Sequence, residues 1–182
     1  EGKFPIPIKL RILKQLGALL ADKVMAIGDF IDQYYGIKSD AVSYGAVSDQ
    51  VSEQQPVATT RTAKQRTIVA FVGRLARDTG LLEIIKAIPF LPQFEWHFYG
   101  DGPLRESCSQ WGTVHGWSET KPWLVDADII IGSGYLSVWE ALLVGKYVIV
   151  YADNQLKQSY FAKAPFAAHI KITTNRQQFI SA

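Results

Sequence analysis

The stretch ADIIIGSGYLSVWEA, residues 127–141, contains the transition that decides the fold. The apolar run 129–131 is typical of a buried strand, and the Gly-Ser-Gly turn leads into an apolar helical pattern over 136–144 that ends before Gly145. A strand that enters a helix through a glycine turn is the unit of a parallel α/β sheet. The free backbone N–H groups at the start of such a helix favour an anion.

The same alternation continues on both sides of this stretch. The apolar patterns predict strands at 67–72, 95–99, 113–115, 147–151 and 169–172. A helix is predicted over 81–88, ended near Pro89 and Pro92. Alternating strands and helices predict one α/β domain over residues 67–182, with a Rossmann-like parallel sheet flanked by helices.

Residues 1–47 are predicted to form a separate, smaller piece with strands at 23–27 and 41–44, and the polar segment 48–66 is predicted to be a linker. Over 8–20, basic residues alternate with leucine and isoleucine, which indicates an amphipathic helix. Two interpretations of its apolar face remain. Packing against a neighbouring sheet is favoured, and contact with a membrane surface is the alternative.

Composition limits the class of protein. With 48% hydrophobic and 20% charged residues, the chain is expected to be globular. Cys108 is the single cysteine, which excludes an internal disulfide and favours a reducing compartment such as the cytoplasm. A net charge of +2 gives no general field for nucleic acids. Because the chain does not begin with methionine, we interpret it as a piece of a longer protein.

Two further segments end strands in glycine turns. In Val72-Gly73-Arg74-Leu75, Arg74 is placed to contact a phosphate, although on this segment alone a surface position or a salt bridge is the favoured explanation. In the segment 98–104, Asp101 is expected to cap the following helix with Pro103 in its first turn, so a purely structural role is favoured.

Glu140 lies about one turn into the helix that follows the Gly-Ser-Gly turn, among residues expected to be buried. A carboxylate in that position needs a polar partner. Ribose hydroxyls and a structural salt bridge are both open as that partner.

Together these segments resemble the C-terminal domain of retaining GT-B glycosyltransferases, the class of glycogen and sucrose synthases. The similarity runs from residue 67 to about 160 and rests on VGRL (72–75), YGDGPL (99–104), HGW (115–117), AD (127–128), EA (140–141) and GK (145–146). More faintly, residues 21–45 resemble the last strands of the N-terminal GT-B domain.

The resemblance implies a donor site for a nucleotide-diphosphate sugar. Arg74 would face the diphosphate as the catalytic residue, Glu140 would hold the ribose, and Trp117 would either stack on the base or pack in the core. The implied donor-binding residues are Gly73, Arg74, Arg77, Gly116, Trp117, Gly134, Tyr135, Leu136, Ser137 and Glu140.

Two positions depart from the family pattern. Thr79 stands where the family has a lysine, which leaves Arg77 as the nearest cationic substitute, and Gly132 stands where the family has the first of two glutamates. Either the donor is held in a divergent way or the domain is a non-catalytic partner subunit. We favour divergence because Arg74 and Glu140 are retained.

The predicted reaction is transfer of the sugar to an acceptor hydroxyl, with retention, in glycan or glycolipid synthesis. No metal or other cofactor is expected, since no Asp/His ligand cluster appears in the sequence. The expected partners are a nucleotide sugar and an acceptor glycan or lipid-linked glycan, not a nucleic acid, with peripheral contact at the inner face of a membrane as an option. A nucleotide-sugar epimerase is a weaker alternative, and the piece alone is expected to be nearly inactive.

Overall fold

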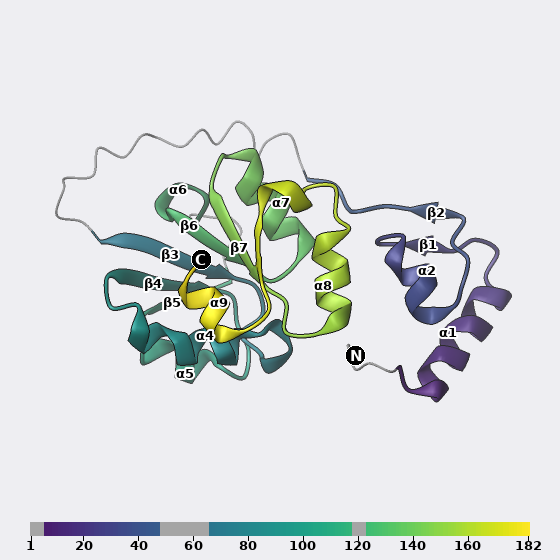
Figure 1. The fold of residues 1–182 in the computed structure, drawn as a ribbon, viewed down its shortest axis with the longest axis horizontal. Coiled ribbons are helices and arrows are strands. Elements are labelled where there is room, and N and C mark those ends of the chain that lie inside the picture. The colour runs from purple at the N-terminus through teal and green to yellow at the C-terminus, as the bar shows by residue number, and fades with distance from the viewer. Residues whose placement is uncertain (1–5, 48–65, 118–122) are drawn as a thin grey trace.

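The computed structural model describes residues 6–47, 66–117 and 123–182, and it has two units (Figure 1). The smaller unit consists of α1 (Ile8–Leu20), β1 (Met25–Ala26), α2 (Phe30–Tyr35) and β2 (Ala41–Val42). Its two strands pair in parallel. The predicted linker, apart from Arg66, lies outside the described residues.

The larger unit is built on a six-stranded parallel sheet with the order β5-β4-β3-β6-β7-β8. Its strands are β3 (Thr67–Val72), β4 (Phe94–Tyr99), β5 (Thr113–Gly116), β6 (Ile129–Gly132), β7 (Tyr147–Tyr151) and β8 (Lys171–Thr173). From β3 the chain adds strands on one side, and from β6 it adds them on the other. The boundary between β3 and β6 is therefore a topological switch point, where open α/β sheets bind ligands.

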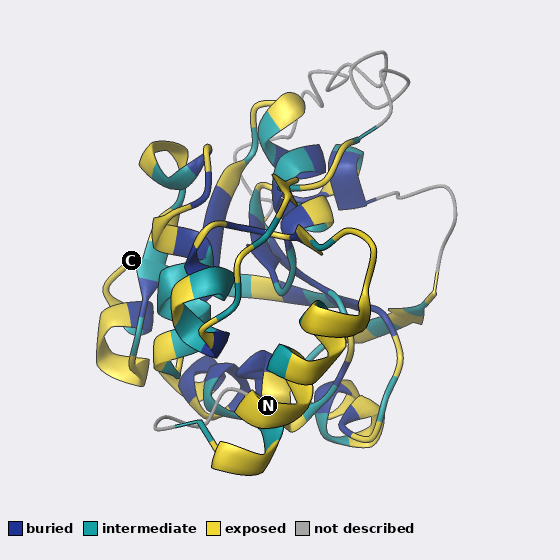
Figure 2. Ribbon diagram, turned by 90° about the vertical axis from the view of Figure 1, so that its right-hand side faces the viewer, coloured by how far each residue is buried: buried dark blue, intermediate teal, exposed yellow. Residues whose placement is uncertain are grey.

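Helices cover both faces of this sheet. One face carries α4 (Leu81–Ala87), α5 (Arg105–Ser109) and α9 (Arg176–Ile180), and the other carries α6 (Trp123–Asp126), α7 (Tyr135–Leu143) and α8 (Gln155–Ala162). Short 3-10 turns occupy Arg77–Thr79, Ile88–Phe90 and Ala167–His169. Successive residues of β3, β6 and β7 alternate between two apolar cores, so buried residues gather on these central strands (Figure 2). The predicted Rossmann-like fold is confirmed.

The predicted strands of the larger unit agree with the structure to within one residue except at the last one, whereas the strands predicted at 23–27 and 41–44 shrink to two residues each. The expected strand at 169–172 is displaced, because His169 ends a 3-10 turn in which its N–H donates to the Phe166 carbonyl at 2.9 Å. The strand begins only at Lys171, where pairing with β7 starts. Because His169 belongs to this turn, it cannot adopt the extended conformation of a strand, and β8 starts two residues later.

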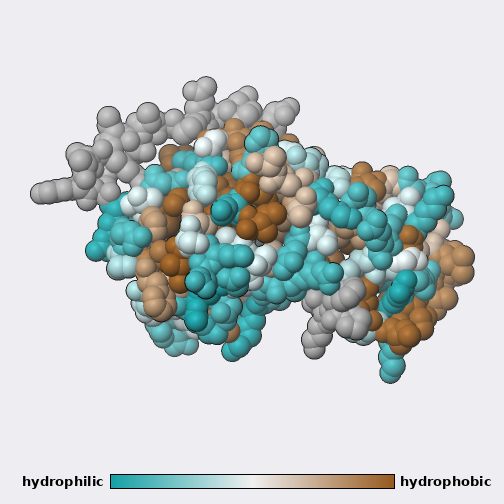
Figure 3. Space-filling view, in the orientation of Figure 1, coloured by the Kyte–Doolittle hydropathy of each residue, from teal (hydrophilic) through white to brown (hydrophobic). Residues whose placement is uncertain are grey.

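The favoured interpretation of residues 8–20 is wrong. The helix forms as α1, but the side of it that faces α2 carries Gln15, whose Nε2 donates to the carbonyls of Tyr35 and Gly36 at 3.2 and 3.1 Å. The apolar side chains point outward and form the apolar face of α1: Ile8, Ile12, Leu13, Leu16, Leu19 and Leu20, each at least 50% exposed. The neighbouring sheet has only two strands of two residues each and does not reach this face. Figure 3 shows apolar surface over α1.

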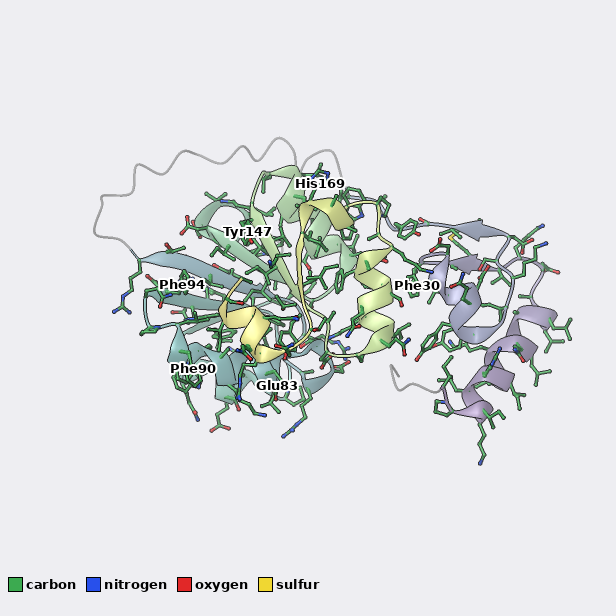
Figure 4. All side chains as sticks on the ribbon, viewed as in Figure 1. Phe30, Glu83, Phe90, Phe94, Tyr147 and His169 are labelled. Carbon is green, nitrogen blue, oxygen red and sulfur yellow. The ribbon has the colours of Figure 1, made fainter. Side chains whose placement is uncertain are left out.

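The two units meet at α8. The ring of Phe30 packs edge-on against Tyr160 with centroids 5.9 Å apart, and Lys163 Nζ donates to Gln33 Oε1 at 3.2 Å (Figure 4). Phe30 is only 3% exposed, which makes it the main apolar contact of α2 with the larger unit. Among the helices in the described parts of the chain, none combines the length and hydrophobicity needed to cross a bilayer.

Candidate functional site

A cavity of about 730 Å³ opens at the switch point, where the chain leaves the carboxyl ends of β3, β4 and β5 and where α7 passes above them. The sequence predicts this edge of the sheet as the site, and most of the predicted residues lie here. The cavity is lined by Val72, Gly73, Arg74, Tyr99, Gly100, Asp101, Gly116, Trp117, Trp123, Leu136, Ser137 and Glu140.

Main-chain hydrogen bonds tie the loops under the cavity together. The Gly73 N–H donates to the Tyr99 carbonyl at 3.0 Å, and the Gly100 N–H donates to the Gly116 carbonyl at 2.8 Å. The Leu75 N–H donates to the Asp101 carbonyl at 2.9 Å. These bonds extend the sheet beyond its strands and form a main-chain floor.

Gly73 cannot be replaced without strain. Its φ of +143° is a conformation that side-chain-bearing residues rarely adopt. A Cβ at this position would lie 1.7 Å from Ser133 Oγ. The glycine therefore brings the turn after β3 into direct contact with the turn after β6.

Arg74 follows this turn with its guanidinium in solvent. Its Nη2 lies 2.5 Å from Asp78 Oδ2, and the side chain of Arg74 is 72% exposed. An ion pair this exposed contributes little to stability, so an anion can replace the carboxylate at low cost. Arg77 is also exposed, but it lines neither this cavity nor the pocket next to it.

Glu140 lies in the second turn of α7, where Val138 and Ala141 pack against the sheet. Its side chain is buried at 9% exposure and borders the cavity. Trp117 lines the cavity and is 84% exposed, so the alternative that it packs in the core is wrong.

A second pocket of about 490 Å³ lies between the two units and shares Gly73, Leu136 and Ser137 with the cavity. Tyr44 of the smaller unit faces Tyr135, with ring centroids 6.0 Å apart. Tyr135 in turn stacks on Tyr160 at 3.6 Å, and its backbone N–H donates to the Tyr160 hydroxyl at 3.2 Å. Of the predicted donor residues, Gly134 and Tyr135 border this second pocket rather than the cavity.

The two departures from the family pattern have structural correlates. A Cβ on Gly132 would lie 2.5 Å from Val138 Cγ2, so α7 occupies the space that a side chain there would need. Thr79 is buried, with its hydroxyl 2.7 Å from the Ala76 carbonyl and 3.2 Å from the Arg74 carbonyl. Thr79 thus secures the turn that carries Arg74 and leaves that position without a cation.

The sequence interpretation missed Tyr99, Gly100 and Asp101, to which it gave only a structural role. They line the cavity. Asp101 does not cap the next helix, because α5 begins after Leu104 and the Asp101 carboxylate instead accepts the Gly102 N–H at 2.8 Å. The signal was available, since β4 precedes a glycine turn at the edge that the switch-point rule selects.

A chain of polar side chains supports the Tyr99 wall. Tyr99 stacks on His115 at 4.2 Å with the planes 4° apart. His115 Nε2 lies 3.0 Å from His97 Nδ1, and His97 Nε2 lies 2.9 Å from Glu95 Oε1. Burial and the nearby Asp126 raise the pKa of Tyr99 to about 12, so its hydroxyl stays protonated.

No three His, Cys, Asp or Glu side chains gather in metal-binding geometry within residues 6–47, 66–117 and 123–182. This observation does not test whether the reaction needs a metal, so the expectation of a reaction without one remains a prediction.

No family model and no curated protein matches the sequence. Solved structures do match the fold. Anabaena HepE in complex with UDP superposes with a TM-score of 0.65 at 15% identity, over 96% of this chain and 56% of HepE. A glycosyltransferase from Rickettsia africae gives 0.61 at 14% identity, over 99% and 57%, respectively.

The lipopolysaccharide outer core galactosyltransferase WaaB, in its apo form, gives a TM-score of 0.58 at 19% identity, over 88% of this chain and 51% of WaaB. This chain thus spans about half the length of the structures it matches. With the switch-point sheet and the attached smaller unit, these likenesses identify the fold of the chain as that of the GT-B glycosyltransferases.

Proposed function

We propose that this chain carries the donor site of a glycosyltransferase, which transfers a sugar from a nucleotide-diphosphate sugar to an acceptor hydroxyl with retention, in glycan or glycolipid synthesis. The observation that carries the proposal is the switch-point cavity, which has Arg74, the start of α7 and buried Glu140 around one space. Its volume of about 730 Å³ is within the range of small-molecule sites. HepE, with the same fold, was solved with UDP.

Different residues of the cavity would bind the diphosphate, the ribose and the base of the donor. The diphosphate lies against Arg74 and the positive end of α7, which both favour negative charge. The Tyr135 N–H already donates to the Tyr160 hydroxyl. We therefore expect the next two backbone N–H groups, those of Leu136 and Ser137, to donate hydrogen bonds to the phosphate oxygens. The Glu140 carboxylate accepts hydrogen bonds from the ribose hydroxyls, and Gly116 and Trp117 border the base.

The chemistry follows from these positions. The bond between the anomeric carbon and the diphosphate oxygen breaks, and that oxygen keeps the electron pair. The acceptor oxygen forms the new bond to the anomeric carbon, and its proton passes to the oxygen of the departing diphosphate. Arg74 and the α7 N-terminus stabilise the charge of the departing diphosphate, so the proposed step needs no metal or other cofactor.

The acceptor enters from the second pocket. Tyr44, which is only partly buried, presents its aromatic ring there, and such rings pack well against the C–H faces of a sugar. The shared border at Gly73 and Ser137 connects this pocket to the donor cavity. An acceptor glycan, free or lipid-linked, fits this arrangement.

We further propose that the protein acts at the cytoplasmic face of a membrane and that an anionic lipid surface covers the apolar face of α1. Lys9 lies within that face and α1 has no acidic residue, while Arg11 and Lys14 lie on the side of the helix toward α2, where Lys14 Nζ is 5.7 Å from the centroid of the Tyr35 ring. Apolar side chains bordered by cations are typical of helices that lie on anionic bilayers.

Calorimetry with UDP, GDP, ADP and dTDP tests the donor site. One nucleotide should bind selectively, and Glu140→Ala should weaken it by roughly tenfold or more, since buried hydrogen bonds to a carboxylate are lost. Glu106→Ala, on the surface of α5, is the matched control and should leave the affinity unchanged. If the folded wild type binds none of the four, the donor site is refuted.

Vesicle sedimentation tests the lipid contact. The protein should sediment with phosphatidylglycerol vesicles and not with phosphatidylcholine vesicles, and Ile12→Ser with Leu16→Ser should abolish the effect. Phe90→Ser removes an equally exposed apolar side chain far from α1 and should change nothing. Failure to bind either vesicle, or a dimer in solution that the α1 substitutions dissolve, overturns the lipid proposal.

A non-catalytic partner subunit is the second candidate. It is favoured by Val138, which fills the space beside Gly132, and by Thr79, which places no cation at the site. In that case Arg74→Ala leaves the function of the assembly intact, whereas in the enzyme it abolishes donor binding. The same calorimetric titration therefore separates the two candidates.

A further inference from the structure

The hydroxyl groups that border the second pocket differ in whether they have a hydrogen-bond partner. Five side chains there carry a hydroxyl: Tyr44, Ser133, Tyr135, Ser137 and Tyr160. The Tyr135 hydroxyl donates to the Tyr160 carbonyl, and the Tyr160 hydroxyl accepts the Tyr135 N–H at 3.2 Å. The Tyr44 hydroxyl donates to a carboxylate oxygen of the smaller unit at 3.2 Å, and the Ser137 hydroxyl donates to the main-chain carbonyl three residues before it at 3.0 Å. Among the described residues, the Ser133 hydroxyl alone of the five has no hydrogen-bond partner.

The main chain fixes where the Ser133 side chain points. The Ser133 N–H donates to the Val72 carbonyl at 3.2 Å, so the pairing of β3 with β6 continues through this residue. Side chains alternate along a strand, and the position of Gly132 faces Val138 of α7, so the next side chain points to the opposite side. On that side a Cβ on Gly73 would lie 1.7 Å from Ser133 Oγ. The serine hydroxyl therefore occupies the place where Gly73 has no side chain.

This hydroxyl lies where the donor cavity and the second pocket meet. Gly73, which it contacts, lines both spaces, and Ser133 itself is half-buried and borders the second pocket. The fully buried side-chain polar atoms that lack a partner in the described parts of the chain belong to Trp96, Trp139 and Lys157, so Ser133 Oγ is open to the pocket. A ligand hydroxyl in this space can supply the hydrogen bond that the protein does not.

In the proposed reaction, the transferred sugar lies at the same border. The diphosphate lies against Arg74 and the N-terminus of α7, and the acceptor enters from the second pocket. The anomeric carbon is bonded to the diphosphate and must come within about 3–3.5 Å of the acceptor oxygen. The sugar therefore occupies the space beside Gly73 and Ser137, the border that both pockets share, and Ser133 Oγ lies against that border.

We propose that Ser133 is a specificity-determining residue whose hydroxyl forms a hydrogen bond with a hydroxyl of the transferred sugar. The inference rests on the proposed donor function and assigns a contact to the sugar, the one part of the donor for which that function names no side chain. A serine hydroxyl both donates and accepts, so it pairs with a sugar hydroxyl that does either. A sugar without a hydroxyl at the matching position leaves Ser133 unpaired and binds less tightly.

The test compares donors with and without the sugar. Calorimetry measures the affinities for UDP-glucose, GDP-mannose, ADP-glucose and dTDP-glucose beside those for UDP, GDP, ADP and dTDP. Ser133→Ala should weaken binding of the preferred sugar nucleotide by roughly three- to tenfold, since one hydrogen bond is lost. It should leave the affinity for the corresponding nucleoside diphosphate unchanged. Ser109→Ala, on the exposed surface of α5, is the control and should change neither affinity.

A second variant separates hydrogen bonding from packing. Ser133→Cys fills the place of the hydroxyl with a thiol, which is a weak hydrogen-bonding group. If the hydroxyl binds the sugar, the cysteine variant should lose affinity for the sugar nucleotide as Ser133→Ala does. If the side chain only fills the space beside Gly73, the cysteine variant should bind like the wild type, and the proposal is overturned.

Failure of this inference and failure of the donor function give different results. If Ser133→Ala binds the sugar nucleotide as tightly as the wild type does, the inference is overturned while the donor function stands. An equal loss of affinity for the sugar nucleotide and for the nucleoside diphosphate would assign Ser133 a structural role, which also overturns the inference. If the wild type binds none of the diphosphates, the donor function fails and the inference fails with it.

Discussion

Residues of this site differ in how much a substitution should destabilise the fold, as two glycines of its loops illustrate. Gly73 has a φ of +143° and contacts Ser133, whereas a Cβ added to Gly134 meets nothing within 4 Å. Gly73→Ala should therefore lower the free energy of unfolding by about 2 kcal/mol or more, while Gly134→Ala should change it by at most about 0.5 kcal/mol. Urea denaturation measures both, and equal effects would contradict this picture of the turn.

Cys108 is fully buried on α5, and burial raises the pKa of its thiol to about 11. At pH 8 only about one thiol in a thousand is then ionised, and the thiolate is the reactive form. We expect no reaction with Ellman's reagent in the native protein and one equivalent after unfolding in guanidinium. A rapid native reaction would mean that α5 opens readily.

His115 gives the pH dependence of the cavity wall. Burial and the neighbouring His97 lower its pKa below the ordinary value of 6.5, and Asp126 opposes them. A histidine whose pKa is depressed stabilises the fold fully above its unfolded pKa and loses that contribution as the pH falls below about 6.5. NMR titration should place the His115 midpoint below 6.5, and His97→Gln should move it upward. A midpoint at or above 6.5 in the wild type would refute the prediction.

At the scale of elements, α7 and β6 are fitted to each other around Gly132. Gly132→Glu forces the new side chain against Val138, so we expect strong destabilisation. Val138→Ala opens the space, and the double variant should be more stable than the sum of the two single effects by about 1 kcal/mol or more. A double-mutant cycle by denaturation measures this coupling. Additive effects would show that Val138 does not exclude a side chain at 132.

The elements themselves could be predicted because their signals are local. The apolar runs of β3 and β7 and the glycine turns after β3 and β6 depend on residues next to one another in the sequence. The order of the strands could not be predicted in this way, and it decides which loops meet. Tyr99 and Glu140 lie about forty residues apart and border one cavity only because β4 and β6 both pair with β3.

The apolar face of α1 is a second feature that the local sequence pattern predicts only in part. Its periodicity correctly predicts an amphipathic helix, but periodicity states only that one face is apolar and not what covers it. In the structure the side of the helix with Gln15 meets α2 and the leucines face outward. Which face turns inward depends on contacts with α2, which lie outside the helix itself.

At the scale of the whole molecule, the two units are joined through few side chains. Phe30→Ala removes the ring that packs against Tyr160, so α2 should lose hydrogen-exchange protection while β3, β6 and β7 keep theirs. Phe90→Ala removes a mostly exposed ring on the larger unit and serves as the control. A uniform loss of protection across both units would mean that they unfold as one cooperative body.

The floor of the cavity is made by main-chain atoms, with Gly73, Gly100 and Leu75 donating to carbonyls of the neighbouring loops. Amides and carbonyls are common to almost every amino acid, so most substitutions in these loops leave the hydrogen bonds intact, except at the glycines that need a positive φ. Evolution can therefore exchange the side chains around the cavity, and with them the choice of ligand, while the geometry of the floor is inherited. The site can change its chemistry faster than its shape.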